Sequence, residues 1–177
     1  MRRPVQHSSD ETLYAAALRA LMRRAHSVFE MRTYLERRTD DADSAKRVLA
    51  RLRESRLLDD ARYALEFARN RVRARRQGRH RVARELRQRG VPDAHIAAAV
   101  EQVFGETDEA ALVRTTLERR LRALRGPLDQ RKSASLYRSL LRAGFDADLI
   151  RRELQNARRN ETEETTDLPH ECSAEDL

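Results

Sequence analysis

One apolar pattern occurs three times along this chain, and it limits the possible folds more than any other feature of the sequence. When the copies are aligned on Thr39, Gly90 and Gly144, an apolar residue stands at the same four offsets in each copy. Set by set, these residues are Met31, Val82 and Leu136; Leu35, Leu86 and Leu140; Ala45, Ile96 and Ile150; and Leu49, Val100 and Leu154. The offsets follow helical spacing, and the reference positions lie 51 and 54 residues apart. Such a period is typical of tandem helical repeats.

The pattern predicts an all-α chain of three tandem three-helix repeats. Repeats of this kind stack on their neighbours rather than around one centre, so we expect an elongated, curved molecule. Aromatic residues make up only 5% of the 177 residues and tryptophan is absent, which predicts a core of leucine, alanine and valine. The expected segments are a flexible N-terminus over residues 1–10, repeats over 11–57, 58–105 and 106–159, and a disordered acidic tail over 160–177.

The second repeat opens with two leucines and two aspartates. Asp59 and Asp60 precede a run of helix formers, so we expect them at the N-cap and in the first turn of a helix. A metal-binding pair is disfavoured, because adjacent helical side chains point about 100° apart. Apolar side chains recur along this helix, and we interpret them as core rather than as a platform for stacked bases. They are Ala61, Ala64, Leu65, Ala68 and Val72, with Tyr63 and Phe67 beside them.

Ten arginines lie between residues 69 and 89, where Glu85 is the one carboxylate. At helical spacing, Glu85 is expected to pair with Arg81 or Arg89. Gly78 interrupts the arginine run. Gly90, with Pro92 just beyond it, predicts a left-handed helix C-cap.

The positive charge of the chain is unevenly distributed. The formal net charge is +8, but residues 158–177 carry two arginines against seven carboxylates, a net of −5, which leaves +13 for residues 1–157. A domain this basic usually meets an acidic partner, because arginine pairs with phosphates and carboxylates. The predicted contact residues are Arg69, Arg73 and Arg76, spaced for one helical face, together with Arg79, Arg81 and Arg84.

No motif in the sequence points to catalysis. Glycine-rich phosphate loops are absent, and no nucleophile, base and orienting group occur together. The five histidines lack ligand spacing, so we predict no metal, no cofactor and no enzymatic activity. The lone Cys172 favours a reducing cytoplasm, and the sequence shows neither a signal peptide nor an apolar run long enough for a membrane span.

The second repeat resembles the RecX family of bacterial recombination regulators. The family signature reads LLDDxRYAxxF, then Gly, then RxxxEL, then RG and a small aliphatic residue. The matching positions are Leu57, Leu58, Asp59, Asp60, Arg62, Tyr63, Ala64 and Phe67, followed by Gly78, Arg81, Glu85, Leu86, Arg89, Gly90 and Val91. The resemblance extends over about residues 11–157 and is weakest in the third repeat.

The resemblance implies a non-enzymatic modulator of the RecA recombinase. Members of the family bind the filament that RecA forms on single-stranded DNA, lie along its helical groove, and suppress ATP hydrolysis, strand exchange and co-protease activity. We expect this chain to act in that way as a cytoplasmic monomer, with DNA as a further contact. A curved basic rod is compatible with such a groove.

Two alternatives come from other classes of protein. The first is a DNA-binding protein that places one helix of a repeat in the major groove. Against it, the third helix of the second repeat, over residues 92–103, carries no arginine, lysine or asparagine to contact base edges. The second is a helical scaffold whose charge serves solubility alone. The acidic tail is interpreted either as a dispensable extension or as an autoinhibitory segment that competes for the arginines.

Overall fold

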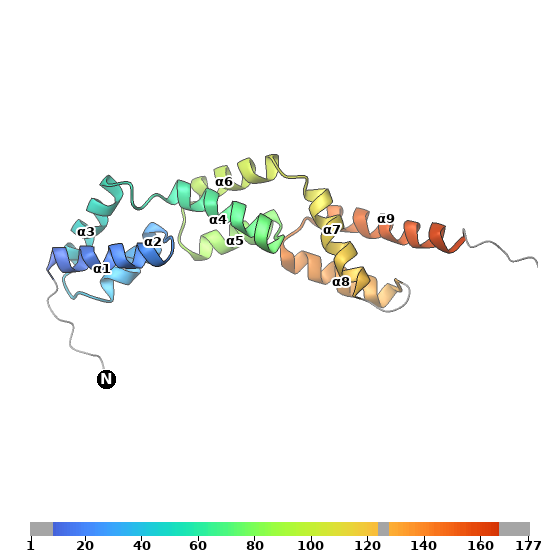
Figure 1. Ribbon diagram of the computed structural model, residues 1–177, viewed down its shortest axis with the longest axis horizontal. Coiled ribbons are helices and arrows are strands. Elements are labelled where there is room, and N and C mark those ends of the chain that lie inside the picture. The colour runs from blue at the N-terminus through green and yellow to red at the C-terminus, as the bar shows by residue number, and fades with distance from the viewer. Residues whose placement is uncertain (1–8, 124–127, 167–177) are drawn as a thin grey trace, which may run out of the picture. The chain divides into compact units, whose positions relative to one another are not determined.

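The computed structural model describes residues 9–123 and 128–166, with side chains described as far as residue 160. Helices are the only regular secondary structure within these ranges (Figure 1). In chain order they are α1 (Asp10–Arg23), α2 (Val28–Glu36), α3 (Ala42–Glu54), α4 (Asp60–Arg75), α5 (Arg79–Gln88), α6 (Asp93–Gly105), α7 (Glu109–Arg122), α8 (Gln130–Ala143) and α9 (Ala147–Thr166). The prediction of an all-α fold is confirmed.

The helices group in threes along the chain. Helices α1, α2 and α3 pack against one another, as do α4, α5 and α6, and α7, α8 and α9. These groups are called repeats one, two and three below. Repeats one and two belong to one compact unit that ends at Thr107, and repeat three belongs to a second unit that begins at Asp108. The elongated, curved shape expected from stacked repeats stays a prediction.

The apolar positions that define the repeat are core positions. The residues eight and four before the reference position and six after it are buried in all three repeats. The position ten after it is buried as Leu154 in repeat three but only half-buried as Leu49 and Val100 in the other two. Each repeat therefore has its own small apolar core, and the fourth position lies at the edge of that core.

Two of the three reference positions are left-handed turns. The φ angle is +67° at Gly90, just after α5, and +92° at Gly144, just after α8. At Gly90 an added Cβ would also lie 2.4 Å from the Cγ atom of Phe29 in repeat one. Glycine is therefore required at Gly90 both for the turn and for a close contact between two repeats. The predicted left-handed cap at Gly90 is confirmed.

Helix α4 begins as the sequence predicts. Asp59 is its N-cap, and the Asp59 carboxylate accepts a hydrogen bond from the Arg62 N–H at 3.0 Å. That hydrogen bond lowers the pKa of Asp59. Asp60 occupies the first turn. The same kind of cap starts α1 at Ser9 and α3 at Asp41.

Two helix ends differ from the sequence prediction. Helix α9 continues to Thr166, so the expectation of a disordered tail is wrong for residues 160–166, whereas residues 167–177 lie outside the described part. No glycine or proline interrupts the chain there, and extending an existing helix adds one hydrogen bond per residue. Helix α3 ends at Glu54, before residue 57 where the first repeat is expected to close, and Arg56 beyond it adopts a positive φ of 55°.

Candidate functional site

The arginine-rich region of repeat two is formed by α4, α5 and the short break between them. Helix α4 ends at Arg75, and its C-cap, Arg76, has the left-handed backbone conformation with φ +48°. Gly78 lies at the break as predicted, but it is the N-cap of α5 with an ordinary φ of −79°. The prediction that Arg76 shares a helical face with Arg69 and Arg73 is therefore wrong, because the helix has ended before Arg76.

Four side chains of this region form a compact cluster of hydrogen bonds and ion pairs, which we call the Glu85 cluster. Glu85 pairs with Arg81 on the same helix at 2.9 Å, as predicted, and with Arg71 on α4 at 2.9 Å. The Gln77 amide donates to the same carboxylate at 3.1 Å. Burial raises the pKa of Glu85, but the Arg81 hydrogen bond, the Arg71 charge and the Gln77 amide outweigh it, and the pKa falls below its ordinary value. The cluster thus connects α4 to α5.

Tyr63 and Phe67 do not lie in the core. Both side chains are half-buried, and their rings stack with centroids 6.0 Å apart. The guanidinium groups of Arg71 and Arg89 lie 4.5 and 4.7 Å from the Phe67 centroid. Arg24 of repeat one completes a hollow of about 310 Å³ around these groups. We call it the aromatic hollow.

The core prediction for the two rings is wrong because α4 turns its small side chains inward. Ala64, Ala68 and Val72 are the buried residues of this helix, and α4 packs closely on α6 through them. Small residues allow two helices to approach each other, whereas the larger Tyr63 and Phe67 rings are half-buried beside Arg71 and Arg89. The periodicity located the buried stripe but did not separate its centre from its margin.

Repeats one and two are joined by side-chain to backbone hydrogen bonds. The Ser27 hydroxyl donates to the Arg89 carbonyl at 2.6 Å, and the Val28 N–H donates to the Asp60 carboxylate at 2.9 Å. The Tyr63 hydroxyl lies 3.4 Å from Glu30, which also pairs with Arg24 at 3.0 Å. We call this set of contacts the seam. Asp60 therefore does more than oppose the helix dipole, a role that sequence reasoning missed.

The pKa values of Glu30 and Tyr63 reflect the position of these side chains in the seam. Burial raises the pKa of Glu30, but the hydrogen bonds from Arg24 and the Ser27 N–H outweigh it, so the pKa of Glu30 is lowered. Burial, followed by the Glu30 charge, raises the pKa of Tyr63. Both groups therefore keep their ordinary neutral-pH states, Glu30 as carboxylate and Tyr63 as phenol, which suits a structural joint.

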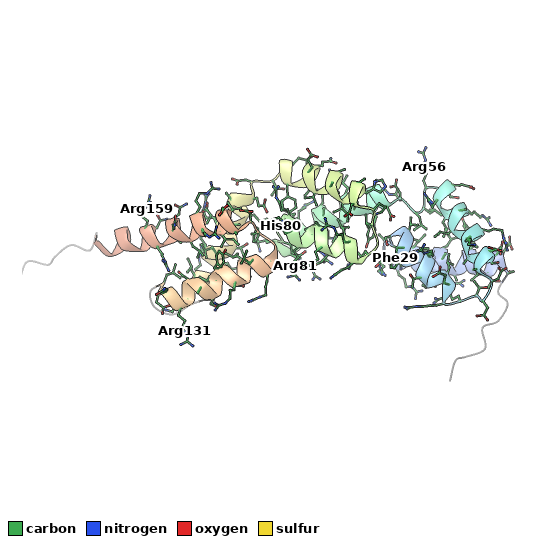
Figure 2. All side chains as sticks on the ribbon, turned by 180° about the vertical axis from the view of Figure 1, so that it is seen from behind. Phe29, Arg56, His80, Arg81, Arg131 and Arg159 are labelled. Carbon is green, nitrogen blue, oxygen red and sulfur yellow. The ribbon has the colours of Figure 1, made fainter. Side chains whose placement is uncertain are left out.

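The six predicted contact arginines have different environments. Arg73 on α4 and Arg84 on α5 are exposed, and neither forms an ion pair with any side chain that the structure describes. Arg69 lies 3.7 Å from Glu66, and Arg79 lies over the Phe104 ring at 5.5 Å. Arg81, labelled in Figure 2, pairs with Glu85 at 2.9 Å and so belongs to the Glu85 cluster. Arg73 and Arg84 are thus the members best placed to meet a partner.

The described side chains offer no site for metal chemistry. No group of three or more histidine, cysteine, aspartate or glutamate residues among them is arranged to hold a metal ion. Within the described helices, none is both long and apolar enough to cross a membrane. The features that stand out are cationic and aromatic, so the fold and surface define a helical-repeat protein with an arginine-rich surface.

Comparisons with known proteins identify the family. Residues 14–52 match the first three-helix domain of RecX, and residues 59–100 match the second. The Halorhodospira halophila protein named Regulatory protein RecX is 42% identical over 144 residues, covering 81% of this chain and 87% of that one. The Streptomyces coelicolor protein of the same name is 31% identical, covering 91% and 85%. The chain belongs to the RecX family of regulatory proteins.

Solved structures agree on the fold. The crystal structure of RecX from Lactobacillus salivarius superposes with a TM-score of 0.72 over 83% of this chain and 95% of that one, at 21% identity. A second crystal structure, of regulatory protein RecX, gives a TM-score of 0.67 at 22% identity. The family resemblance stated from the sequence is confirmed.

Proposed function

We propose that this chain regulates the RecA recombinase by binding the filament that RecA forms on single-stranded DNA. It suppresses ATP hydrolysis, strand exchange and co-protease activity without catalysis of its own, and it acts in the cytoplasm as a monomer. Family membership supports the regulatory part of the proposal. The proposed contact surface rests on one observation: Arg73 and Arg84, on adjacent helices of repeat two, are exposed and form no ion pair with a described side chain.

The physical basis of the proposed inhibition is differential affinity. A protein that binds one filament geometry better than another shifts the filament toward that geometry, by at most the difference in binding free energy. The seam attaches repeat two to repeat one through hydrogen bonds, which suits this role because the two repeats can then engage the filament together. Arg69, Arg76 and Arg79 extend the proposed contact surface, while Arg81 supports it through its pairing with Glu85.

The test is the DNA-dependent ATPase of the cognate RecA, titrated with this protein at physiological salt. DNA is kept in excess of the capacity of this protein to bind it, since a merely basic protein would otherwise inhibit by coating the DNA. Inhibition at well below one molecule per RecA subunit is expected. Absence of inhibition under these conditions contradicts the proposal.

A second candidate function is direct binding of single-stranded DNA through phosphate contacts. It is favoured by the aromatic hollow, where Tyr63 and Phe67 are half-exposed beside three arginines, since aromatic faces stack on bases in single-strand channels. Tyrosine fluorescence titrated with a thymidine oligonucleotide tests it. Tight, salt-dependent quenching that Phe67→Ala removes, together with a RecA ATPase that is unaffected, would favour this second function.

A further inference from the structure

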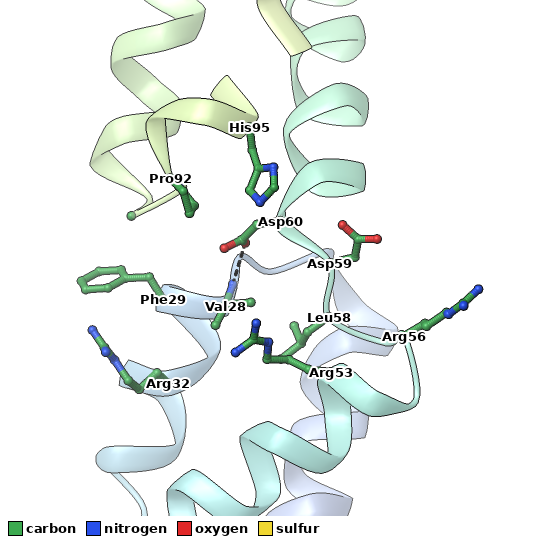
Figure 3. A pocket seen from close by; sticks show the side chains of 11 residues that line it. Val28, Phe29, Arg32, Arg53, Arg56, Leu58, Asp59, Asp60, Pro92 and His95 are labelled. Carbon is green, nitrogen blue, oxygen red and sulfur yellow. Dashed lines mark hydrogen bonds between the residues drawn. The ribbon is translucent and has the colours of Figure 1, made fainter. Parts of the chain in front are cut away.

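A larger hollow lies at the seam between repeats one and two, and its lining is distinct from that of the aromatic hollow. Its volume is about 660 Å³. Repeat one contributes arginines and apolar side chains, and repeat two contributes the start of α4, the turn at Gly90 and the start of α6. We call it the seam hollow, and Figure 3 shows its lining.

The floor of the seam hollow is fixed by the seam itself. The hydrogen bond from the Val28 N–H to Asp60 crosses it, and Leu58 below is buried (Figure 3). Phe29 forms an apolar rim with 43% of its surface exposed. Its ring lies against the backbone of Gly90, where any Cβ would collide with it. The apolar rim is therefore held in place rather than free to collapse into the hollow.

Three arginines line this space, and two of them, Arg32 and Arg53, are available to a ligand in it, whereas Arg56 points away from the other lining residues (Figure 3). Arg53 of α3 points into the hollow beneath Asp60 and Val28, and Arg32 of α2 lies beneath Phe29 (Figure 3). Arg53 forms no ion pair with a described side chain. The Arg32 Nε atom lies 3.8 Å from a carboxylate oxygen of Glu36, and both side chains are more than half exposed. A pair this long and exposed contributes little, so Arg32 is also available to an incoming anion.

We propose that the seam hollow binds a short acidic segment of a partner protein. One carboxylate side chain of the segment lies between Arg32 and Arg53, and a neighbouring apolar side chain packs on Phe29. Charge-assisted hydrogen bonds to arginine and burial of an apolar side chain are the two sources of affinity that such a segment needs. The inference deepens the proposed function, on which it rests for the identity of the regulated partner.

The wall contributed by repeat two favours a peptide over a nucleic acid. Asp59 and Asp60 line the same hollow as the two arginines. A continuous phosphate backbone that reached Arg53 would pass these carboxylates and be repelled by them. A peptide carries isolated charges and backbone N–H donors, so it can place a carboxylate on the arginines and a donor toward Asp59. The mixed polarity of the hollow therefore matches a peptide.

The test is a nuclear magnetic resonance titration of the full chain with a short peptide that carries one glutamate next to one leucine. We expect the amide signals of Phe29, Gly90 and His95 to shift together. Arg53→Glu should weaken binding about tenfold, since it places a repelling charge in the hollow. Arg32→Gln serves as a second, milder variant. Arg19→Glu, an equal charge change on the exposed face of α1, should leave the affinity within about twofold.

Three outcomes would overturn the inference. One is a set of shifts confined to the neighbourhood of Arg73 and Arg84, and another is an equal effect of Arg53→Glu and Arg19→Glu. The third is a thymidine oligonucleotide that shifts the seam-hollow amides and loses affinity in Arg53→Glu while peptide binding is unchanged. Because the peptide titration needs no recombinase, its failure is distinguishable from failure of the RecA inhibition assay.

Discussion

Repeats one and two share a fold but differ in how their positive side chains are paired with carboxylates. In repeat one, two of the cations of α3 have acidic partners, with Arg47 at 2.7 Å from Asp10 and Lys46 at 2.9 Å from Asp43. In repeat two, Glu85 is shared by two arginines, and Arg73 and Arg84 form no ion pair in the described part of the chain. The excess charge of repeat two is therefore not needed to hold the repeat together. Its location identifies repeat two as the principal contact surface of our proposal.

The largest expected effect concerns the turn between α5 and α6, where Gly90 packs against Phe29 of repeat one. Gly90→Val should lower the free energy of unfolding by about 3 kcal/mol or more, because a branched side chain is strained at positive φ and collides with Phe29. Urea unfolding followed by circular dichroism measures this loss.

Gly105→Ala is the matched control for that substitution. Gly105 is the last residue of α6, and an added Cβ there meets no atom within 4 Å. The control should preserve stability or raise it by up to about 1 kcal/mol. Equal stabilities for Gly90→Val and wild type would contradict the proposed role of the turn.

Removal of the shared carboxylate should have a smaller effect. Glu85→Ala leaves Arg71 and Arg81 without their partner in a cluster where the Arg71 and Glu85 side chains are 16% and 15% exposed. We expect a loss of about 2 kcal/mol in unfolding free energy. Glu66→Ala breaks the exposed 3.7 Å pair with Arg69 and should cost less than about 0.5 kcal/mol. Similar losses for the two variants would show that the Glu85 cluster does not stabilise repeat two.

The smallest expected effect is on the pH dependence of stability. The folded-state pKa of Glu85 lies below its ordinary value of 4.5, so the unfolded chain takes up the proton first as the pH falls. The stabilisation by Glu85 is therefore fully present above about pH 4.5 and is lost as the pH falls through the folded-state pKa. Glu85→Gln should flatten this acid limb of the urea midpoint against pH. Parallel curves for variant and wild type would count against the Glu85 cluster as a source of acid sensitivity.

The sequence predicted the features that depend on local spacing. The three cores follow from the repeated apolar offsets, and the cap at Asp59 and the turn at Gly90 follow from residue preferences that operate within a few positions. The pairing of Glu85 with Arg81 belongs to the same class, since the two residues lie one helical turn apart. Each of these predictions needed only the chain near the residue concerned.

The features that sequence reasoning missed depend on how helices meet. Arg71 reaches Glu85 only because α4 and α5 lie side by side, and Asp60 reaches Val28 only across the seam. Tyr63 and Phe67 are half-buried beside Arg71 and Arg89, and periodicity alone does not separate such positions from fully buried ones. Arg76 is a further case. It adopts the left-handed backbone conformation that glycine favours, although Gly78 lies only two residues further along the chain.

The most direct test of the central claim compares two double variants in the RecA ATPase assay. Arg73→Glu with Arg84→Glu reverses two exposed, unpaired charges of repeat two, whereas Arg19→Glu with Arg131→Glu makes the same charge change at exposed positions on α1 and α8. We predict that the first raises the half-inhibiting concentration about tenfold and that the second changes it by less than about twofold. Equal potency of the two variants would contradict the assignment of the contact surface to repeat two.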